Sequence, residues 1–129
     1  MTVSTFFLVH TIERMNTVVP VSYRRIFHGY GVYHRGVQFA VLLNDQVYFR
    51  ADDDSRHLYD EQGLPQFAAR SSGSLRSDFY QIPPSFINNT DLLQYWMRVA
   101  IDAAARCGDP EDESLDTPSL PRRRMIYFR

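Results

Sequence analysis

The sequence predicts an α+β domain of two layers, in which helices pack on an antiparallel sheet of about five strands. Alternating apolar and polar residues recur across residues 21–50, which is the period of half-buried strands. Apolar residues at helical spacing occur near the N-terminus and again across residues 91–106. Short turns separate the strands, which favours antiparallel pairing because parallel strands need long crossovers. The expected order of elements is α-β-β-β-α-β-β-α.

The first helix is expected to begin after Ser4, whose hydroxyl can cap it, and to end near Asn16. Its buried face is predicted to combine a stripe at helical spacing with two flanking apolar residues: Leu8, Ile12, Met15, Phe6 and Val9. Pro20 stops the helix, because proline has no backbone N–H to donate. The chain then enters the strands.

Residues 21–50 are expected to form three consecutive strands, with short turns at residues 35–36 and 44–45. The first strand is predicted to run unbroken through Gly29 and Gly31, which lie two residues apart and therefore share a face. Glycine in a strand interior costs stability, so the pair indicates that another backbone packs very close there. A helix crossing the sheet is the expected neighbour, which would make this face the core. A ligand site beside the glycines is the alternative.

The second strand is predicted to alternate cleanly. One face is expected to carry Val37, Phe39, Val41 and Leu43, and the other Gln38 and Ala40. After the third strand, the acidic run at residues 52–54 is expected to cap and begin a short helix that ends at Gly63. A metal site is the less favoured reading, because no glycine-bearing calcium-loop spacing follows these acids.

The C-terminal half is expected to add two strands, at residues 66–70 and 77–82, joined by a serine-rich turn. A cap within residues 88–90 should begin the longest helix, which covers residues 91–106 and ends at Gly108. Its apolar face is predicted to consist of Leu92, Trp96, Val99, Ala100 and Ala103.

The composition changes after residue 108, so the chain is divided into a domain at residues 1–108 and a tail at residues 109–129. The tail begins as an acidic, proline-bearing linker and ends as a basic, aromatic terminus. One interpretation is that its two charge blocks attract each other or fold back on the domain. The other is a docking peptide that adds to a sheet edge. The candidate contact residues of the tail are Arg122, Arg123, Arg124, Tyr127 and Phe128.

The composition excludes several kinds of chemistry. All 14 basic residues are arginine, so no lysine is present for a Walker A site, a Schiff base or a Ser-Lys dyad. Cys107 is the only cysteine, which excludes an internal disulfide and a cysteine-based zinc site. The four histidines, His10, His28, His34 and His57, show no metalloprotease spacing. We therefore expect a protein that is not an enzyme and takes no cofactor or metal.

The net charge of −1 gives no general attraction to nucleic acid. No stretch is long and apolar enough to cross a bilayer, and the N-terminus lacks a signal-peptide pattern. We expect a soluble, cytoplasmic protein without a membrane partner. Arg24 and Arg25 should point to opposite faces of their strand, so at most one lies in the core layer.

Four segments of the chain resemble the N-terminal domain of the TfoX/Sxy family: RRIFHGYGVYHRGVQFAVLLNDQVYFRAD, GLPQF, FYQIP and DLLQYWMRVAIDAAAR. The family motif is present here as Arg24, Arg25, Phe27, Gly29, Tyr30 and Gly31. His28 stands where the family usually has glycine. The resemblance spans about residues 6–106.

The resemblance implies a compact α+β domain, often a homodimer, of the kind found in bacterial competence regulators that assist transcription of DNA-uptake genes. Those regulators usually carry a second, helical domain, for which residues 109–129 leave no room. The expected function is a regulatory adaptor that contacts a transcription-related protein. One alternative is direct DNA binding through Arg24 or Arg25 together with the arginines at residues 122–124. A small-molecule sensor with its pocket beside Gly29 and Gly31 is another.

Overall fold

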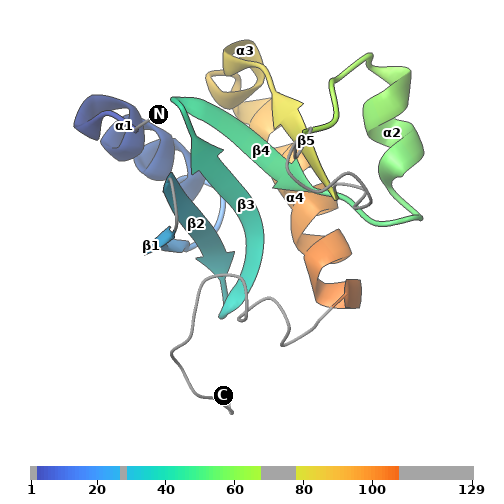
Figure 1. Cartoon of the computed structure of the whole chain (residues 1–129), viewed down its shortest axis with the longest axis horizontal. Coiled ribbons are helices and arrows are strands. Elements are labelled where there is room, and N and C mark those ends of the chain that lie inside the picture. The colour runs from blue at the N-terminus through green and yellow to red at the C-terminus, as the bar shows by residue number, and fades with distance from the viewer. Residues whose placement is uncertain (1–2, 27–28, 68–77, 108–129) are drawn as a thin grey trace.

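The computed structural model describes residues 3–26, 29–67 and 78–107. The elements in chain order are α1 (Thr5–Asn16), β1 (Ser22–Ile26), β2 (Gly29–His34), β3 (Val37–Leu43), β4 (Gln46–Arg50), α2 (Arg56–Glu61), β5 (Phe79–Ile82), α3 (Pro84–Ile87) and α4 (Thr90–Cys107). Five strands form one antiparallel sheet in the order β1-β2-β3-β4-β5, so each strand pairs with its neighbour in sequence (Figure 1). The predicted α+β class and the antiparallel sheet are confirmed.

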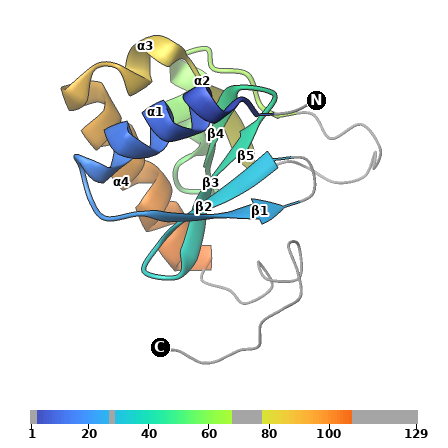
Figure 2. The same ribbon diagram turned by 90° about the vertical axis from the view of Figure 1, so that its left-hand side faces the viewer.

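The helices cover one face of this sheet. α4 packs across β3 and β4, and α3 lies against both α4 and α1. Seen from the side in Figure 2, α1, α3 and α4 lie on the same side of the strands. The predicted two layers are therefore present, and the second layer contains one more helix than expected. α3 is a single turn that begins at Pro84, where the missing N–H of proline costs nothing.

The prediction that the first strand runs unbroken through Gly29 and Gly31 is wrong. The chain reverses between Ile26 and Gly29, and β1 pairs with β2 along its whole length, from Ser22 opposite Tyr33 to Ile26 opposite Gly29. The observed order is therefore α-β-β-β-β-α-β-α-α. No turn-forming dipeptide other than His-Gly occurs at this reversal, and the apolar alternation is continuous across it. Periodicity alone cannot separate one long strand from a tight pair in such a stretch.

The two predicted turns are confirmed. Arg35 and Gly36 have φ values of 55° and 81°, and Asn44 and Asp45 have 54° and 58°. Positive φ at both central residues is the conformation that lets a two-residue hairpin follow the right-handed twist of its strands. The predicted strand at residues 66–70 is reduced to a bridge between Gln66 and Tyr80, and its last three residues lie outside the described part.

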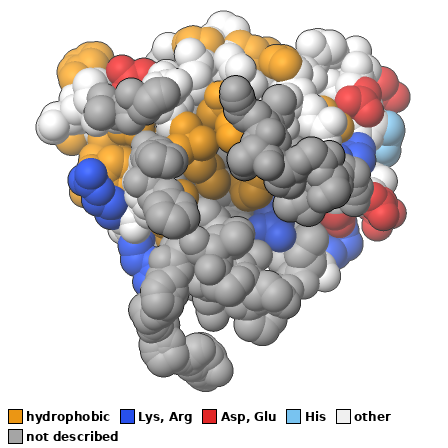
Figure 3. Space-filling model, viewed as in Figure 1, with side chains coloured by type: hydrophobic (Ala, Val, Ile, Leu, Met, Phe, Trp, Pro, Cys, Tyr) orange, Lys and Arg blue, Asp and Glu red, His pale blue; other side chains and the backbone are white. Residues whose placement is uncertain are grey.

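The glycines of β2 lie on the face that the helices leave uncovered. Cross-strand partners share a face of a sheet. Val32, Ala40, Phe49 and Tyr80 are opposite one another and all buried in the core. Gly31 is instead opposite Val41, which is opposite Tyr48, one residue out of step with the core row. The expectation that the glycine face is the core is therefore wrong. Figure 3 shows this second face, where hydrophobic side chains also gather.

An irregularity in β3 explains a second error. The register between β2 and β3 shifts between Val32 and Tyr33, so β3 has one extra residue at this point. Phe39 and Ala40 are both 0% exposed, and the Phe39 ring lies 5.9 Å from the ring of Phe49. The bulge turns Phe39 into the core together with Ala40. The prediction of clean alternation put them on opposite faces, because a bulge leaves no mark in an apolar run.

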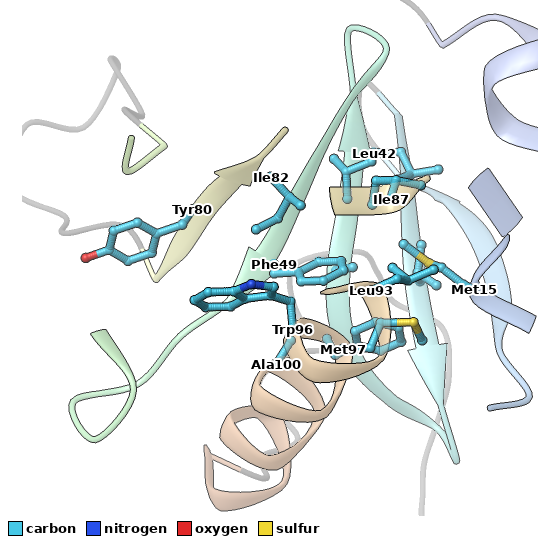
Figure 4. Packing of buried hydrophobic residues seen from close by; sticks show 14 of the residues in the cluster. Met15, Leu42, Phe49, Tyr80, Ile82, Ile87, Leu93, Trp96, Met97 and Ala100 are labelled. Atoms are coloured by element: carbon cyan, nitrogen blue, oxygen red, sulfur yellow. The ribbon is translucent and has the colours of Figure 1, made fainter. Parts of the chain in front are cut away.

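The core lies between the sheet and the helices (Figure 4). Leu93, Trp96, Met97 and Ala100 of α4 meet Leu42, Phe49 and Ile82 of the sheet, and Met15 enters from α1. Each large side chain buried here contributes about 1.5–3 kcal/mol relative to exposure. The predicted helix faces need two corrections: Phe6 and Val9 of α1 are 80% and 47% exposed, and Leu92 of α4 is 37% exposed. Leu93 and Met97 occupy the buried positions instead.

The predicted caps are largely confirmed. Asn89 precedes α4, and its side-chain oxygen accepts a hydrogen bond from Leu92 N–H at 3.0 Å. Gly63 follows α2 with a φ of 71°, the left-handed conformation that suits a helix C-terminus. The acids at residues 52–54 lie before α2 and not in its first turn, which holds no acidic residue. Across the described ranges, no helix is long and apolar enough to cross a membrane.

Candidate interaction surface

β1 forms one end of the sheet. Its residues from Ser22 to Arg25 are exposed, and only Ile26 is half-buried. β1 continues the sheet past the strands that α4 covers, since α4 packs on β3 and β4. An exposed strand at a sheet end presents one row of backbone N–H and C=O groups outward. The β1–β2 pair is therefore the part of the sheet that is best placed to meet another molecule.

The two motif arginines point to opposite faces of β1, and each stacks on a tyrosine of β2. The guanidinium carbon of Arg24 lies 5.3 Å from the centre of the Tyr33 ring, and that of Arg25 lies 5.8 Å from the Tyr30 ring. Tyr23 meets Tyr30 edge to face, with ring centres 5.8 Å apart. Neither arginine is buried, so neither occupies the core layer. Stacking of this kind contributes about 0.5–1 kcal/mol at exposed sites and holds the charge in place.

The two glycines leave room for particular neighbours. A Cβ atom on Gly31 would lie 2.7 Å from Nε2 of Gln38 and 2.9 Å from the hydroxyl of Tyr33. A Cβ atom on Gly29 would lie 1.9 Å from the carbonyl oxygen of Leu42 in β3. The close neighbours are therefore β3 and side chains of the sheet, and not the crossing helix that the sequence predicted.

Gln38 is a polar residue that this packing buries beside Gly31. It is 3% exposed, and its Oε1 has no hydrogen-bond partner. A buried amide oxygen without a partner costs about 1–3 kcal/mol. The sequence predicted Gln38 only as the polar position of an alternating strand, and the bulge at Phe39 is what places it beside Gly31.

α1 presents a second exposed surface, formed by Phe6 and Val9, which we call the α1 outer face. The Phe6 ring stacks on His10, with ring centres 6.0 Å apart. His10 Nε2 lies 2.9 Å from Oδ1 of Asn88, which joins this helix to the segment before α4. Arg14 adds a hydrogen bond to the carbonyl oxygen of Ile87 at 3.1 Å. These bonds fix the rotation of α1 and so keep the outer face turned away from the core.

Charge is distributed unevenly over the molecule. No acidic residue occurs between Glu13 and Asp45, while Arg24, Arg25 and Arg35 all lie in that interval. In Figure 3, basic side chains lie at the left, where Figure 1 places β1, and others lie at the centre and right; most of the visible acidic side chains lie at the right, near α2. The β1 end of the sheet is thus a local positive region on a chain whose net charge is −1.

On the acidic side of the molecule, Asp52 connects Ser55 with Arg106. Its carboxylate accepts hydrogen bonds from Arg106 Nε at 2.6 Å and from the backbone N–H and the hydroxyl of Ser55 at 3.0 Å and 2.9 Å. The hydrogen bond from Arg106 is the main reason that the pKa of Asp52 is lowered, and Ser55 lowers it further. Asp52 therefore has a structural role. Within residues 3–26, 29–67 and 78–107, no group of three or more His, Cys, Asp or Glu side chains is placed to hold a metal ion.

Several predicted site residues lie outside the described residues. These are Phe27, His28, Arg122, Arg123, Arg124, Tyr127 and Phe128. The described motif residues Arg24, Arg25, Gly29, Tyr30 and Gly31 are brought together by the β1–β2 pairing. Sequence reasoning missed the part played by Tyr23 and Tyr33, which needs the hairpin to be recognised. The absence of acids between Glu13 and Asp45 was visible in the sequence and would have marked the positive region.

Residues 13–104, which include all five strands, the C-terminal end of α1 and most of α4, match the sequence model of the TfoX N-terminal domain. No curated protein matches the chain.

Proposed function

We propose that this chain, which belongs to the TfoX N-terminal domain family, acts as a regulatory adaptor that binds a transcription-related protein. In this proposal it catalyses no reaction, works in the cytoplasm and assists expression of the genes for DNA uptake. Family membership supports the regulatory part of the proposal. The protein-binding part rests on one observation, which is the α1 outer face.

The α1 outer face favours a protein partner over a solvated role. Phe6 is 80% exposed although it belongs to a helix whose opposite side is anchored in the core by Ile12 and Met15. Aromatic side chains are enriched where proteins bind one another, because they bury a large area at a small entropic cost. Val9 lies one helical turn further along and widens the same apolar surface. A patch of this kind gains free energy when a partner covers it.

Direct DNA binding is the second candidate, and the positive region at β1 is the observation that favours it. Arginines that contact phosphates release counterions, so such binding weakens steeply with salt. The net charge of −1 opposes this candidate. A titration of duplex DNA with the full chain at low and moderate salt separates the two candidates. Salt-sensitive binding that is lost in an Arg24→Glu/Arg25→Glu variant would establish the DNA candidate.

The adaptor proposal is tested in a strain that lacks the gene. We expect deletion to lower the transcripts of the DNA-uptake genes and the frequency of transformation. The wild-type gene should restore both, while a Phe6→Ser/Val9→Ser variant should not, because it removes the apolar contact without disturbing the core. Leu92→Ser on α4, which is 37% exposed, is the matched control and should restore both. Unchanged transcripts in the deletion strain would overturn the proposal.

A further inference from the structure

The outer edge of β1 pairs with no other strand in the described part of the sheet. β1 is the strand at one end of the sheet, and its pairing with β2 uses only one of its two edges. An extended peptide can add to such an edge as a further strand, gaining affinity from main-chain hydrogen bonds and specificity from side chains. The other end of the sheet differs, because residues around Gln66 pair with β5 there.

The side chains on β1 determine which peptide this edge can accept. Arg24 and Arg25 stand on opposite faces, held over Tyr33 and Tyr30. A second copy of the chain that paired through the same edge would bring arginine against arginine, and like charges opposite each other destabilise strand pairing. Charged residues on sheet edges protect proteins from such self-pairing. The same charges attract a strand with carboxylates.

We propose that the β1 edge binds an extended acidic segment of a protein partner, which adds to the sheet as a further strand. Because Arg24 and Arg25 serve opposite faces, the segment carries two adjacent acidic residues, one directed to each face. Tyr23 lies on the same face as Arg25, beside Tyr30, and provides an apolar surface for a neighbouring β-branched residue. This inference rests on the proposed function as a protein-binding adaptor and adds the chemistry of the partner.

The sequence on either side of β1 fits the inference. No acidic residue occurs between Glu13 and Asp45, and Arg35 in the turn after β2 adds to the positive charge. Arginine also suits this role, because its planar guanidinium group can donate two parallel hydrogen bonds to one carboxylate while it stacks on an aromatic ring.

The test is a fluorescence anisotropy titration of the full chain with a labelled peptide that has an Asp-Glu pair flanked by threonine and valine. We expect binding that weakens by about ten-fold or more in an Arg24→Glu/Arg25→Glu variant. A matched peptide with a Lys-Lys pair should show the reverse preference and bind the variant. The control variant Arg98→Glu, which changes the same charge on an exposed position of α4, should bind like the wild type.

A second peptide tests strand addition apart from charge. It keeps the Asp-Glu pair, but N-methyl groups on consecutive backbone amides block both edges of the strand, so we expect its binding to be lost. Equal binding of the methylated peptide would overturn the inference, because charge alone would then account for the contact. A full-chain variant with Asp112→Asn/Glu113→Gln removes the chain's own acidic pair. Tighter peptide binding by this variant would show that the pair competes for the same edge and would support the acidic preference.

Other outcomes separate this inference from the proposed function. No binding of the acidic peptide by either full-chain form would overturn the inference, and so would a preference for single-stranded DNA over the peptide. If the Arg24→Glu/Arg25→Glu variant restores transcription in the deletion strain, the edge has no part in the adaptor role and the inference fails while the function stands. If deletion leaves transcription unchanged although the peptide binds, the proposed function fails and the binding edge stands.

Discussion

Gly29 and Gly31 lie two residues apart in β2, yet they meet different kinds of neighbour. An added methyl group on Gly29 meets a backbone carbonyl of the paired strand, which cannot move without breaking the ladder. An added methyl group on Gly31 meets the ends of the Gln38 and Tyr33 side chains, which can rotate away. The two positions therefore form a natural pair of substitutions, in which the chemistry of the change is identical and only the neighbour differs.

We expect Gly29→Ala to lower the free energy of unfolding by about 2–3 kcal/mol, because overpacking against backbone forces the strands apart. Gly31→Ala should cost about 1 kcal/mol or less. Urea unfolding followed by the fluorescence of Trp96, the only tryptophan, measures both. Equal costs for the two variants would contradict this account of the glycine pair.

The glycine pair also shows what the sequence could and could not predict about single residues. The spacing correctly predicted that something packs very close to β2. It could not identify the neighbour, because that depends on which face the helices cover. Tyr30 and Val32 lie on the face opposite the glycines and are large side chains that a core can hold. From the sequence, either face of the strand could therefore be the core face. The burial of Val32 at 0% exposed decides the question, and burial depends on contacts far along the chain.

At the scale of elements, Asp52 joins the start of α2 to the end of α4. Its carboxylate bonds to Ser55 and to Arg106 at the same time, so the ends of two helices share one charge. The Asp52 side chain is 15% exposed and that of Arg106 is 46% exposed. Water partly screens such a pair, which keeps its contribution small.

We expect Asp52→Asn to lower stability by about 1 kcal/mol at neutral pH, since the charge-assisted hydrogen bonds are weakened. The lowered pKa of Asp52 gives a stabilisation that is present above the pKa of an unfolded aspartate, about 3.9, and is lost as the pH falls through the folded-state pKa. The difference between wild type and variant should therefore shrink in acid. Thermal unfolding at neutral and acidic pH measures it.

Asp54 is the matched control for this prediction. It also faces Arg106, but at 3.7 Å and with its side chain 79% exposed. Asp54→Asn should change stability by only about 0.3 kcal/mol. A loss as large as that of Asp52→Asn would mean that general charge attraction to Arg106, and not the Ser55–Asp52–Arg106 bonds, governs this corner of the molecule.

The helices and strands could be predicted from the sequence where turn-forming residues mark their ends, and were missed where such residues are absent. The turns at residues 35–36 and 44–45 carry Gly, Asn and Asp, and both were predicted. The reversal between β1 and β2 lacks such a pair. The sequence prediction therefore had no turn there and merged two strands into one. α3 is too short to show helical periodicity, although Pro83-Pro84 marks its start. The bulge at Phe39 is a mismatch in the pairing of two strands, so the pattern of one strand alone cannot show it.

At the scale of the whole molecule, a cluster of aromatic rings joins α2, β5 and α4. The Tyr59 ring stacks on Tyr80 with centres 4.7 Å apart and meets Trp96 at 4.9 Å. The Tyr59 hydroxyl donates a hydrogen bond to the carbonyl oxygen of Arg50 at 3.1 Å, which adds β4 to the cluster. Four elements therefore depend on one buried phenol, and its ionisation would affect all of them at once.

Burial raises the pKa of Tyr59 far above the usual value of about 10, because the phenolate would have little water around it. The unfolded chain ionises this residue near pH 10, while the folded chain keeps it neutral. Stability from Tyr59 is thus complete below pH 10 and decreases as the pH rises above it. We expect alkaline unfolding in this range, reported by a red shift of the fluorescence of Trp96, which is 4% exposed in the folded state.

Two phenylalanine variants show whether Tyr59 is responsible. Tyr59→Phe should cost about 1–2 kcal/mol at neutral pH, since its hydrogen bond to the Arg50 carbonyl is lost, but its stability should decrease less steeply above pH 10. Tyr95→Phe removes a hydroxyl from a residue that also contacts Trp96 but is 48% exposed, so its alkaline transition should match that of the wild type. If both variants shift the transition equally, the ionisation of exposed tyrosines drives the unfolding. If only Tyr59→Phe does so, the one phenol shared by α2, β4, β5 and α4 sets the alkaline limit of the fold.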